Sequence, residues 1–373
     1  MPINPTEIYI GLMSGTSLDG VDIAIADFAG ALPKLLFSTT YPYHNSIRSR
    51  IRDITLNPSA SIDSLCQLDI ELGKVYAEVV NHSLAKINLA HSQILAIGCH
   101  GQTIRHRPDA AFPYTLQSGD PNTVAAETGI ATVADFRGKD VALGGEGAPL
   151  ATAFHQFMFS SATTNRAIIN IGGIANITYL PCQPGQTVLG FDTGPGNTLM
   201  DCWVQLHKNK AYDNYGQWAK SGLIINQLLD AMMEEPYFKR PPPKSTGTDY
   251  FNPDWLAAYR PDDYAPADIQ ATLLELTALS IADGISQLPA MPSECFVCGG
   301  GAHNLYLLAR LQKALPESTI STTAQLKVDP DYIEALAFAW LAKQRINNLP
   351  GNIPSVTRAS AQSALGGIYS GYI

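Results

Sequence analysis

Two stretches of the chain share one pattern, which is a strand, a glycine-rich turn and two further strands. In the first stretch, "IYIGLMSGTSLDGVDIAIADF" sets two apolar runs around a turn of glycines and hydroxyl groups, and a third run covers residues 35–43. In the second, "AIINIGGIANITYL" and "TVLGFDTGPGN" give the same order. Apolar residues at strand spacing predict strands in both stretches. A strand meander that occurs twice indicates two related lobes of an α/β protein.

The chain length agrees with two lobes. At 373 residues, the chain is longer than the size at which a single hydrophobic core usually stops growing. We place the N-terminal lobe at residues 1–160, completed by residues 346–373, and the C-terminal lobe at residues 161–345.

Helices are predicted between and after the two meanders. Ser61 and Asp63 are candidate caps of a long helix, and Asp120 before Pro121 begins another. The long helix covers residues 62–84, and the other predicted helices cover residues 46–54, 148–159, 196–206, 268–286 and 330–344.

Three further segments carry polar residues. "ILAIGCHGQT" is predicted as a strand that runs into a glycine turn with His100, Gln102 and Thr103, and "IATVADFRG" as a strand whose polar end carries Asp135 and Arg137. "EEPYFKRPPPKSTGTDYF" is predicted as a proline-rich surface segment.

The composition favours a globular protein that acts on small molecules. Hydrophobic residues make up 46% and charged residues 15%, which excludes a disordered or fibrous chain. A net charge of -9 argues against nucleic acid or an anionic membrane as the main partner. The N-terminus has no basic leader with an apolar core, and no window approaches 18 apolar residues. We therefore expect a cytoplasmic protein.

The six cysteines indicate no metal site. Cys295 and Cys298 form the only close pair, and neither a second pair nor a nearby histidine accompanies them. Buried thiols in a reducing compartment are the simpler interpretation.

Three glycine-rich turns follow predicted strands: "MSGTSLDG", "NIGGIAN" and "FVCGGGAHN". Glycines let the backbone approach a ligand closely, and consecutive N–H groups form concave sites for phosphates. One such turn is more often a tight connection, but three favour nucleotide binding. No G-x-x-x-x-G-K-[ST] motif occurs, and "GFDTGPGNTL" departs from the dinucleotide fingerprint because Leu199 occupies the third glycine position.

Phosphoryl transfer needs one carboxylate at the nucleophile and others near magnesium. Asp192 ends an apolar strand and is the candidate for the first role, although it is also placed to cap the following helix. Asp19 and Asp22 lie at the opening turn, where an Asx turn is the alternative. Glu334 opens a helix, where the helix dipole alone favours an acid. Arg137 suits an anionic substrate or an ion pair with Asp135.

Together, "GLMSGTSLDGVDIAIADF", "HGQT", "VADFR", "GGEGAPL", "NIGGIANIT", "GFDTGPGN", "CGGGAHN" and "EALAFAWLA" resemble the anhydro-N-acetylmuramic acid kinases of bacterial peptidoglycan recycling. The resemblance runs from residue 10 to residue 367, and "EEPYFKRPPPKSTG" also fits the family pattern. It implies an actin-like ATPase fold of two lobes, each a mixed five-stranded sheet flanked by helices, with the active site in the cleft between lobes. It also implies a homodimer.

The implied reaction converts ATP, water and 1,6-anhydro-N-acetylmuramic acid to ADP and N-acetylmuramic acid 6-phosphate, with Mg²⁺ as cofactor. Asp192 would be the general base and Glu334 a second catalytic carboxylate, and Asp19 and Asp22 would serve the metal. Carried over to this sequence, the ATP-binding residues are Gly15, Thr16, Ser17, Leu18, Asp19, Gly20, Val21, Asp22, Gly172, Gly173, Asn176, Gly299, Gly300, Gly301 and Asn304. The substrate-binding residues are His100, Arg137, Asp192, Gly194 and Glu334.

Other interpretations stay open at this point. Another sugar or carboxylate kinase of the same fold would share these motifs. A non-catalytic actin-like module would bind nucleotide and work by closure or assembly, and a dinucleotide oxidoreductase would bind NAD in place of ATP.

Overall fold

The computed structural model describes residues 6–371 except Thr16 and Pro58. The chain forms two compact units, which are unit 1 (Met1–Phe154 and Tyr332–Ile373) and unit 2 (His155–Asp331). The sequence-based boundaries after residues 160 and 345 differ from these. The second difference matters most, because it transfers the helix that carries Glu334 to unit 1.

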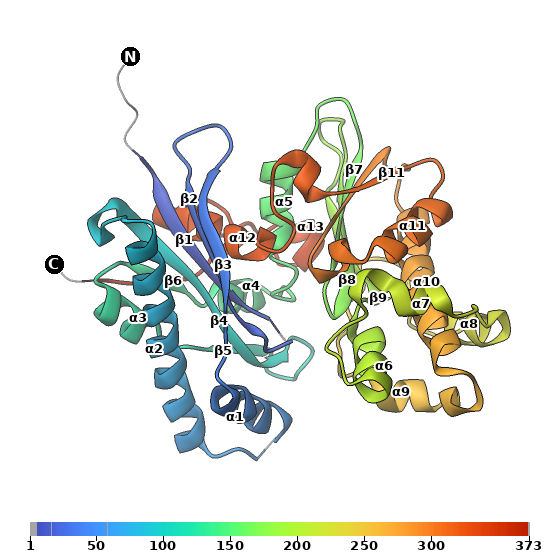
Figure 1. Ribbon diagram of the computed structural model, residues 1–373. Coiled ribbons are helices and arrows are strands. Elements are labelled where there is room, and N and C mark those ends of the chain that lie inside the picture. Colours follow the sequence, from blue (N-terminus) through green and yellow to red (C-terminus); the bar gives the residue numbers. More distant parts are fainter. Residues whose placement is uncertain (1–5, 16, 58, 372–373) are drawn as a thin grey trace. The chain divides into compact units, whose positions relative to one another are not determined.

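Unit 1 is built on a mixed sheet (Figure 1). Its first three strands form the antiparallel meander predicted from the sequence, and the next two join it in parallel. The strands, in sheet order, are β3 (Lys34–Pro42), β2 (Gly20–Asp27), β1 (Ile8–Ser14), β4 (Ile94–Arg107) and β6 (Thr132–Ala134).

Two more strands extend this sheet beyond the five that were expected. β4 continues past the expected glycine turn, and its second half pairs with β5 (Tyr114–Ser118). The tail strand β12 (Gly367–Tyr369) pairs with β6. The sheet therefore has seven strands within the described residues, and the expectation of five strands is wrong for unit 1.

Unit 2 repeats the five-strand order. β7 (Arg166–Ile171), β8 (Ile174–Leu180) and β9 (Leu189–Pro195) form the meander, and β10 (Glu294–Cys298) and β11 (Thr319–Thr322) are parallel to β7. The order β9-β8-β7-β10-β11 matches β3-β2-β1-β4-β6 of unit 1. The repeat predicted from the two glycine-containing meanders is confirmed, and the fold is the two-lobed actin-like fold that the resemblance implied.

Helices flank both sheets. The predicted caps Ser61 and Asp120 are confirmed, whereas Asp63 lies inside the first turn of its helix. The Ser61 side chain accepts from the Ser64 backbone, and Asp120 accepts from the backbones of Asn122 and Thr123. The helices of unit 1 are α1 (Asn45–Leu56), α2 (Ile62–Lys86), α3 (Pro121–Thr128), α4 (Phe136–Ala142), α12 (Ile333–Ile346) and α13 (Pro354–Thr357). Those of unit 2 are α6 (Thr198–Lys208), α7 (Gln217–Ser221), α8 (Asn226–Met233), α9 (Pro253–Ala257), α10 (Pro266–Ser286) and α11 (Leu305–Ala314), and α5 (Ala151–Phe159) contains the boundary.

Two glycines fix α12 on the sheet of unit 1. A Cβ atom at Gly11 of β1 would lie 1.8 Å from the Ala335 carbonyl oxygen, and one at Gly98 of β4 would lie 2.0 Å from that of Phe338. Only strands without side chains at these positions let the helix backbone approach so closely. This packing is why α12 belongs to unit 1.

In unit 2, α10 packs against β8 and β9 of the meander. Ile269, Leu273, Leu276 and Ile281 of α10 are fully or almost fully buried in the hydrophobic core. Gly284 lets the helix approach β9, since a Cβ atom there would lie 2.8 Å from the Thr193 side chain. Over the residues described, none of the helices combines the length and apolar character that crossing a bilayer requires.

Candidate active site

The first glycine turn joins β1 to β2 and is anchored at its base. The buried Ser14 hydroxyl donates to Oε1 of Gln102 at 2.7 Å and lies 2.7 Å from the Tyr43 hydroxyl. Gln102 in turn donates to the Gly15 carbonyl at 3.4 Å. Arg48 donates to the Leu18 carbonyl at 3.0 Å. These contacts hold Ser14, Gly15 and Leu18 in place on the two sides of the turn.

The predicted phosphate-binding residues of this turn differ in exposure. Ser17 and Asp19 are exposed and Gly15 is half-buried, whereas Val21 is fully buried. Leu18 and Gly20 are also buried, and Leu18 has a φ of 57°, the left-handed region that lets a turn reverse in few residues. Thr16 lies outside the described residues. The side chain of Val21 is directed into the core, so only its backbone is available to a ligand.

Asp22 is the half-buried carboxylate of this region. It lies on β2 and accepts a 2.6 Å hydrogen bond from the Thr40 hydroxyl on β3. It is also close enough to Glu334 for the two carboxylates to interact electrostatically, and this raises the pKa of Glu334. In the described part of the chain, no three His, Cys, Asp or Glu side chains form a metal cage. Mg²⁺ is usually held by one or two carboxylates with phosphate and water, so Asp22, with Asp19 on the turn, fits that ion.

Arg137 and His100 meet directly. Nε of Arg137 donates to Nε2 of His100 at 3.0 Å, and Nη1 donates to the Gly147 carbonyl at 2.7 Å. The His100 ring also packs on Phe338 of α12, with 4.7 Å between ring centroids. Burial and the neighbouring guanidinium hold the pKa of His100 well below its usual value. The histidine is therefore neutral and accepts a hydrogen bond from the arginine.

Both residues lie elsewhere in the secondary structure than the sequence predicted. His100 is inside β4 rather than in a turn, because Gly101 takes a positive φ of 76° while the strand continues. Arg137 is in the first turn of α4, where the Asp135 carboxylate accepts from the Gly138 backbone at 3.1 Å. Asp135 therefore caps the helix that carries Arg137.

Glu334 completes the group in unit 1. It lies in the first turn of α12, as expected, and is half-buried. Burial raises its pKa above the usual value of 4.5, and Asp22 adds to this, although the positive charge of Arg137 acts in the other direction. Arg137 itself has its pKa lowered by burial, with Glu334 and Asp140 opposing that effect. The charges of Glu334 and Arg137 therefore each affect the pKa of the other group.

The sequence did not indicate Asp140, a fully buried carboxylate that is connected to Arg137 through Gly147. Oδ2 accepts from the Gly147 backbone at 2.8 Å, and Oδ1 accepts from the Asn352 amide and the Thr357 hydroxyl, both at 2.8 Å. Gly147 connects Asp140 to Arg137, because its N–H meets the first and its carbonyl meets the second. The only sequence signal is a charged residue one helical turn after Arg137, which does not distinguish it from a surface residue.

In unit 2, three polar residues occupy one row across the meander. Asn170 of β7 is opposite Asn176 of β8, and Asn176 is opposite Asp192 of β9. Directly opposed residues point to the same face of a sheet, and all three are half-buried. The row brings the predicted base Asp192 beside the predicted ATP-binding residue Asn176.

The second and third glycine turns converge at the end of this row. Asn197 and Gly196, which precede α6, donate from their backbones to the carbonyls of Gly172 and Gly173 at 2.8 and 2.9 Å. A Cβ atom at Gly300 would lie 3.6 Å from the Asn197 side chain. Two glycine turns that lie far apart in the sequence are thus brought together at the start of α6.

The remaining predicted residues of unit 2 have clear local roles. Gly299 has a φ of 74°, and a Cβ atom there would clash with the Asn170 side chain at 2.5 Å, while one at Gly301 would clash with Ile171. Gly194 has a φ of 149° and lies against Phe238. Asn304 caps α11 by accepting from the Leu307 backbone at 3.0 Å. This cap accounts for Asn304 without a ligand.

Cys295 and Cys298 are buried on β10, and neither forms a disulfide in the described part of the chain. Burial raises the pKa of Cys295 to about 12, so the group is a thiol. This agrees with the interpretation of both as core residues.

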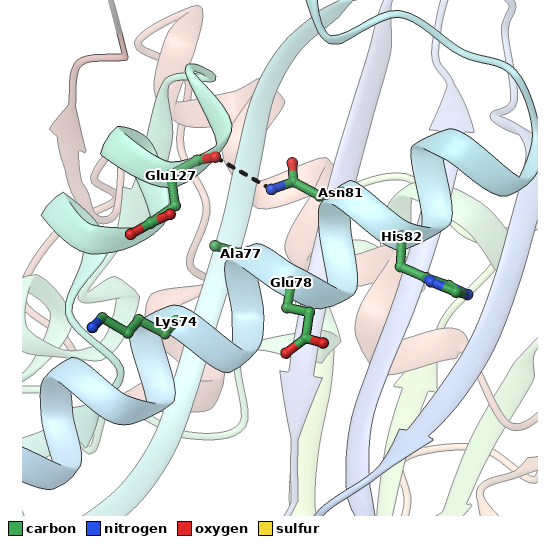
Figure 2. Close-up of a pocket in the computed structure, with 6 residues that line it drawn as sticks. All are labelled: Lys74, Ala77, Glu78, Asn81, His82 and Glu127. Atoms are coloured by element: carbon green, nitrogen blue, oxygen red, sulfur yellow. Dashed lines mark hydrogen bonds between the residues drawn. The ribbon is translucent and has the colours of Figure 1, made fainter.

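A surface hollow of about 440 Å³ lies elsewhere, between α2 and α3 (Figure 2). The Asn81 amide donates to the Glu127 carbonyl at 3.2 Å across it. Its lining residues are Lys74, Ala77, Glu78, Asn81, His82 and Glu127, and none of the predicted site residues is among them.

The comparisons with known proteins agree with the motifs. The family model described as anhydro-N-acetylmuramic acid kinase matches residues 7–371. The anhydro-N-acetylmuramic acid kinase of Saccharophagus degradans is 51% identical over 97% of this chain and 99% of its own, and that of Pasteurella multocida is 48% identical over 98% and 97%. Among solved structures, the activator of 2-hydroxyisocaproyl-CoA dehydratase from Clostridium difficile with bound ADPNP has a TM-score of 0.48 at 13% identity, covering 91% of this chain and 96% of that one. The chain belongs to the anhydro-N-acetylmuramic acid kinase family, whose members are phosphotransferases.

Proposed function

We propose that this protein is an ATP-dependent kinase that converts 1,6-anhydro-N-acetylmuramic acid and water to N-acetylmuramic acid 6-phosphate in peptidoglycan recycling. The observation that carries the proposal is the match of the family model to residues 7–371. We further propose that the enzyme is cytoplasmic and acts as a homodimer.

The reaction opens the anhydro ring and phosphorylates it in one sequence. Water attacks C1 and gives up a proton, and the C1–O6 bond breaks with its electron pair moving to O6. O6 then attacks the γ-phosphorus of ATP, and ADP leaves. O6 is the leaving group of the first step and the nucleophile of the second. Because both steps occur at one site, O6 does not have to meet ATP by diffusion.

Asp192 takes the proton from the attacking water in this proposal. Its carboxylate is half-buried, and one of its oxygens, Oδ2, accepts from the Thr246 backbone at 2.9 Å. A general base typically supplies a rate factor of about 10² to 10⁴. Glu334 acts as the second carboxylate. Burial raises its pKa, so at a given pH a larger fraction of this side chain is protonated than of a surface glutamate.

Arg137 binds the lactyl carboxylate of the sugar. Its guanidinium uses Nε for His100 and one Nη1 hydrogen for Gly147, so with respect to the described residues three of its five N–H donors remain for an anionic ligand. His100 and Gly147 hold the guanidinium plane, which matters because bidentate recognition of a carboxylate depends on that plane.

The glycine turns bind ATP. The anchored turn from Gly15 to Asp22 takes the phosphates, Gly172, Gly173 and Asn176 contribute from unit 2, and Gly299 to Gly301 lie along the nucleoside. Mg²⁺, when bound, neutralises charge on the phosphoryl group in transfer, and Asp19 and Asp22 are the residues that would hold it.

The test is turnover with a sugar panel. The purified protein is incubated with ATP, Mg²⁺ and either 1,6-anhydro-N-acetylmuramic acid, 1,6-anhydro-N-acetylglucosamine, N-acetylmuramic acid or glucose, and ADP and sugar phosphate are quantified. The first sugar should give the highest kcat/KM. A higher value for another sugar would favour a different small-sugar kinase, and ATP binding without any sugar phosphate would favour a non-catalytic module.

A further inference from the structure

The proline-rich segment of residues 234–251, predicted as a surface segment, is exposed at half of its positions but buries several side chains. Tyr237 is 1% exposed, Lys244 is 7% exposed and Phe251 is fully buried. These side chains are buried because the segment runs along β9, where aromatic rings of Tyr237, Phe238 and Phe251 pack on one another. The segment therefore has a structural relationship to the strand that carries Asp192.

β9 is an edge strand of the sheet in unit 2, so its outward backbone groups need partners from outside the sheet. At Asp192, the segment supplies a partner for the backbone N–H and another for the backbone carbonyl. The Asp192 N–H donates to the Lys244 carbonyl at 2.9 Å, and the Tyr237 hydroxyl donates to the Asp192 carbonyl at 2.7 Å.

A third bond reaches the carboxylate itself. The Thr246 backbone N–H donates to Oδ2 of Asp192 at 2.9 Å. Hydrogen bonds from a backbone N–H favour the ionised form of a carboxylate, which is the form that accepts a proton. The same short segment thus holds the backbone of Asp192 on both sides and one of its side-chain oxygens.

Lys244 closes the segment on itself. Its ammonium donates to the Phe238 carbonyl at 2.9 Å and to that of Tyr237 at 3.4 Å, and it lies 5.0 Å from the centre of the Tyr237 ring. Burial lowers the pKa of Lys244, Asp283 acts in the opposite direction, and the positive charge of Arg240 adds a smaller lowering. Burial and the nearby Asp192 raise the pKa of Tyr237, so its hydroxyl keeps the proton that it donates.

We infer that residues 237–246 form a strap whose Tyr237 and Lys244 are positioning residues for Asp192. The inference rests on the proposed function, in which Asp192 activates water. Neither side chain is required to touch the sugar or ATP. Their effect is to fix the direction of the carboxylate, and a displacement on the order of 1 Å in a reacting group can cost about 100-fold in rate.

The test compares two lysines of the same segment. Lys244→Met removes the buried ammonium, whereas Lys239→Met removes one whose side chain is 59% exposed and pairs with Glu234. We expect Lys244→Met to lower kcat by about 10- to 100-fold while the Kd for ATP changes less than about twofold, and Lys239→Met to match the wild type.

The second variant is Tyr237→Phe, which removes only the hydroxyl and keeps the ring. It should lower kcat by about 10-fold. Like Lys244→Met, it should also move the low-pH limb of the kcat profile to higher pH. The reason is that Asp192, once its backbone is no longer held, keeps less of the hydrogen bond from the Thr246 N–H that favours the ionised carboxylate. A merely structural strap would lower the melting temperature and leave this limb where it is. Should Lys244→Met fail to fold, Tyr237→Phe alone decides.

Two failures remain distinguishable. A wild type that forms no sugar phosphate overturns the proposed function and with it this role of the strap. A wild type that turns over, together with folded variants of unchanged kcat and pH profile, overturns the strap alone.

Discussion

Arg137 donates from Nε to Nε2 of His100 at 3.0 Å, which makes the buried histidine an acceptor for the arginine. His100 is 4% exposed, and burial with the neighbouring charge keeps its pKa well below 6.5, so protonation does not compete with this bond near neutral pH. With Nε2 as acceptor, the proton of the neutral ring is on Nδ1. The guanidinium is thus held by an imidazole on one nitrogen and by the Gly147 carbonyl on another.

His100→Phe should weaken binding of the anhydro sugar. Phenylalanine keeps a ring against Phe338 but accepts no hydrogen bond, so Arg137 loses one of its two fixed partners. We expect the KM for the sugar to rise about 10-fold and the Kd for ATP to stay within about twofold, since a hydrogen bond to a charged group contributes roughly 1.5–3 kcal/mol.

The matched control is His106→Phe, on the same strand. His106 is half-buried and lies 3.1 Å from the Thr115 hydroxyl, with no role assigned in sugar binding. Steady-state kinetics should separate the two histidines. Equal KM values for His100→Phe and the wild type would contradict the role of His100.

Asp140→Asn should destabilise the folded protein. The buried carboxylate accepts three hydrogen bonds, and an asparagine turns an NH₂ toward at least one of those donors. We expect a loss of roughly 2–4 kcal/mol in the free energy of unfolding, measured by urea denaturation. Asp135→Asn in the same helix is the control, because asparagine is also a good N-cap and the change should cost less than about 1 kcal/mol. Similar losses in both variants would refute the buried network.

Glu334→Gln should lower turnover and raise the stability of the folded protein near neutral pH. Burial, helped by Asp22 and opposed by Arg137, raises the pKa of Glu334 in the folded protein above 4.5, so the folded state binds this proton more tightly than the unfolded state. The stability from this group is complete below pH 4.5 and is lost as pH rises through the folded pKa. Glutamine does not ionise and avoids that loss.

Melting temperatures at pH 5 and pH 8 check this. The variant should exceed the wild type at pH 8, and the gap should narrow at pH 5, while turnover falls. A variant that melts below the wild type at pH 8 would mean that the attraction to Arg137 outweighs the burial of the carboxylate.

Asp192→Asn should abolish turnover while ATP binding persists. Asparagine keeps the shape of the side chain but cannot take a proton from water, so kcat should fall by at least about 10²-fold. Asp230→Asn, at an exposed position of α8, should leave kcat unchanged. Calorimetry with ATP reports binding in each variant. ATP consumption equal to the wild type in Asp192→Asn would point to a non-catalytic module.

Local sequence patterns predicted most of the fold. Alternating residues identified both meanders, and Ser61 and Asp120 identified their helix starts because caps act over three or four residues. The tail strand β12 was missed, since it depends on pairing with a strand that is remote in the sequence. β12 pairs with β6, and the part of β4 that follows Gly101 pairs with β5.

The sequence indicated candidate site residues, but it did not indicate which residues contact one another. Asp192, Glu334 and Arg137 were proposed as site residues from strand ends, helix starts and family motifs. The contacts of Asp140 with Asn352 and Thr357 join residues more than 200 positions apart, which no local pattern encodes. Proline content predicted a surface segment at residues 234–251, but it did not indicate that Tyr237, Lys244 and Thr246 bond to Asp192 at the outer edge of β9.

The central claim is that ring opening and phosphorylation are coupled through attack of water at C1. The direct measurement is a reaction of the wild-type protein with ATP, Mg²⁺ and 1,6-anhydro-N-acetylmuramic acid in H₂¹⁸O, with mass spectrometry of the products. The account predicts N-acetylmuramic acid 6-phosphate with ¹⁸O in the C1 hydroxyl and none in the phosphate group. Label found in released inorganic phosphate, with no labelled sugar phosphate, would contradict it.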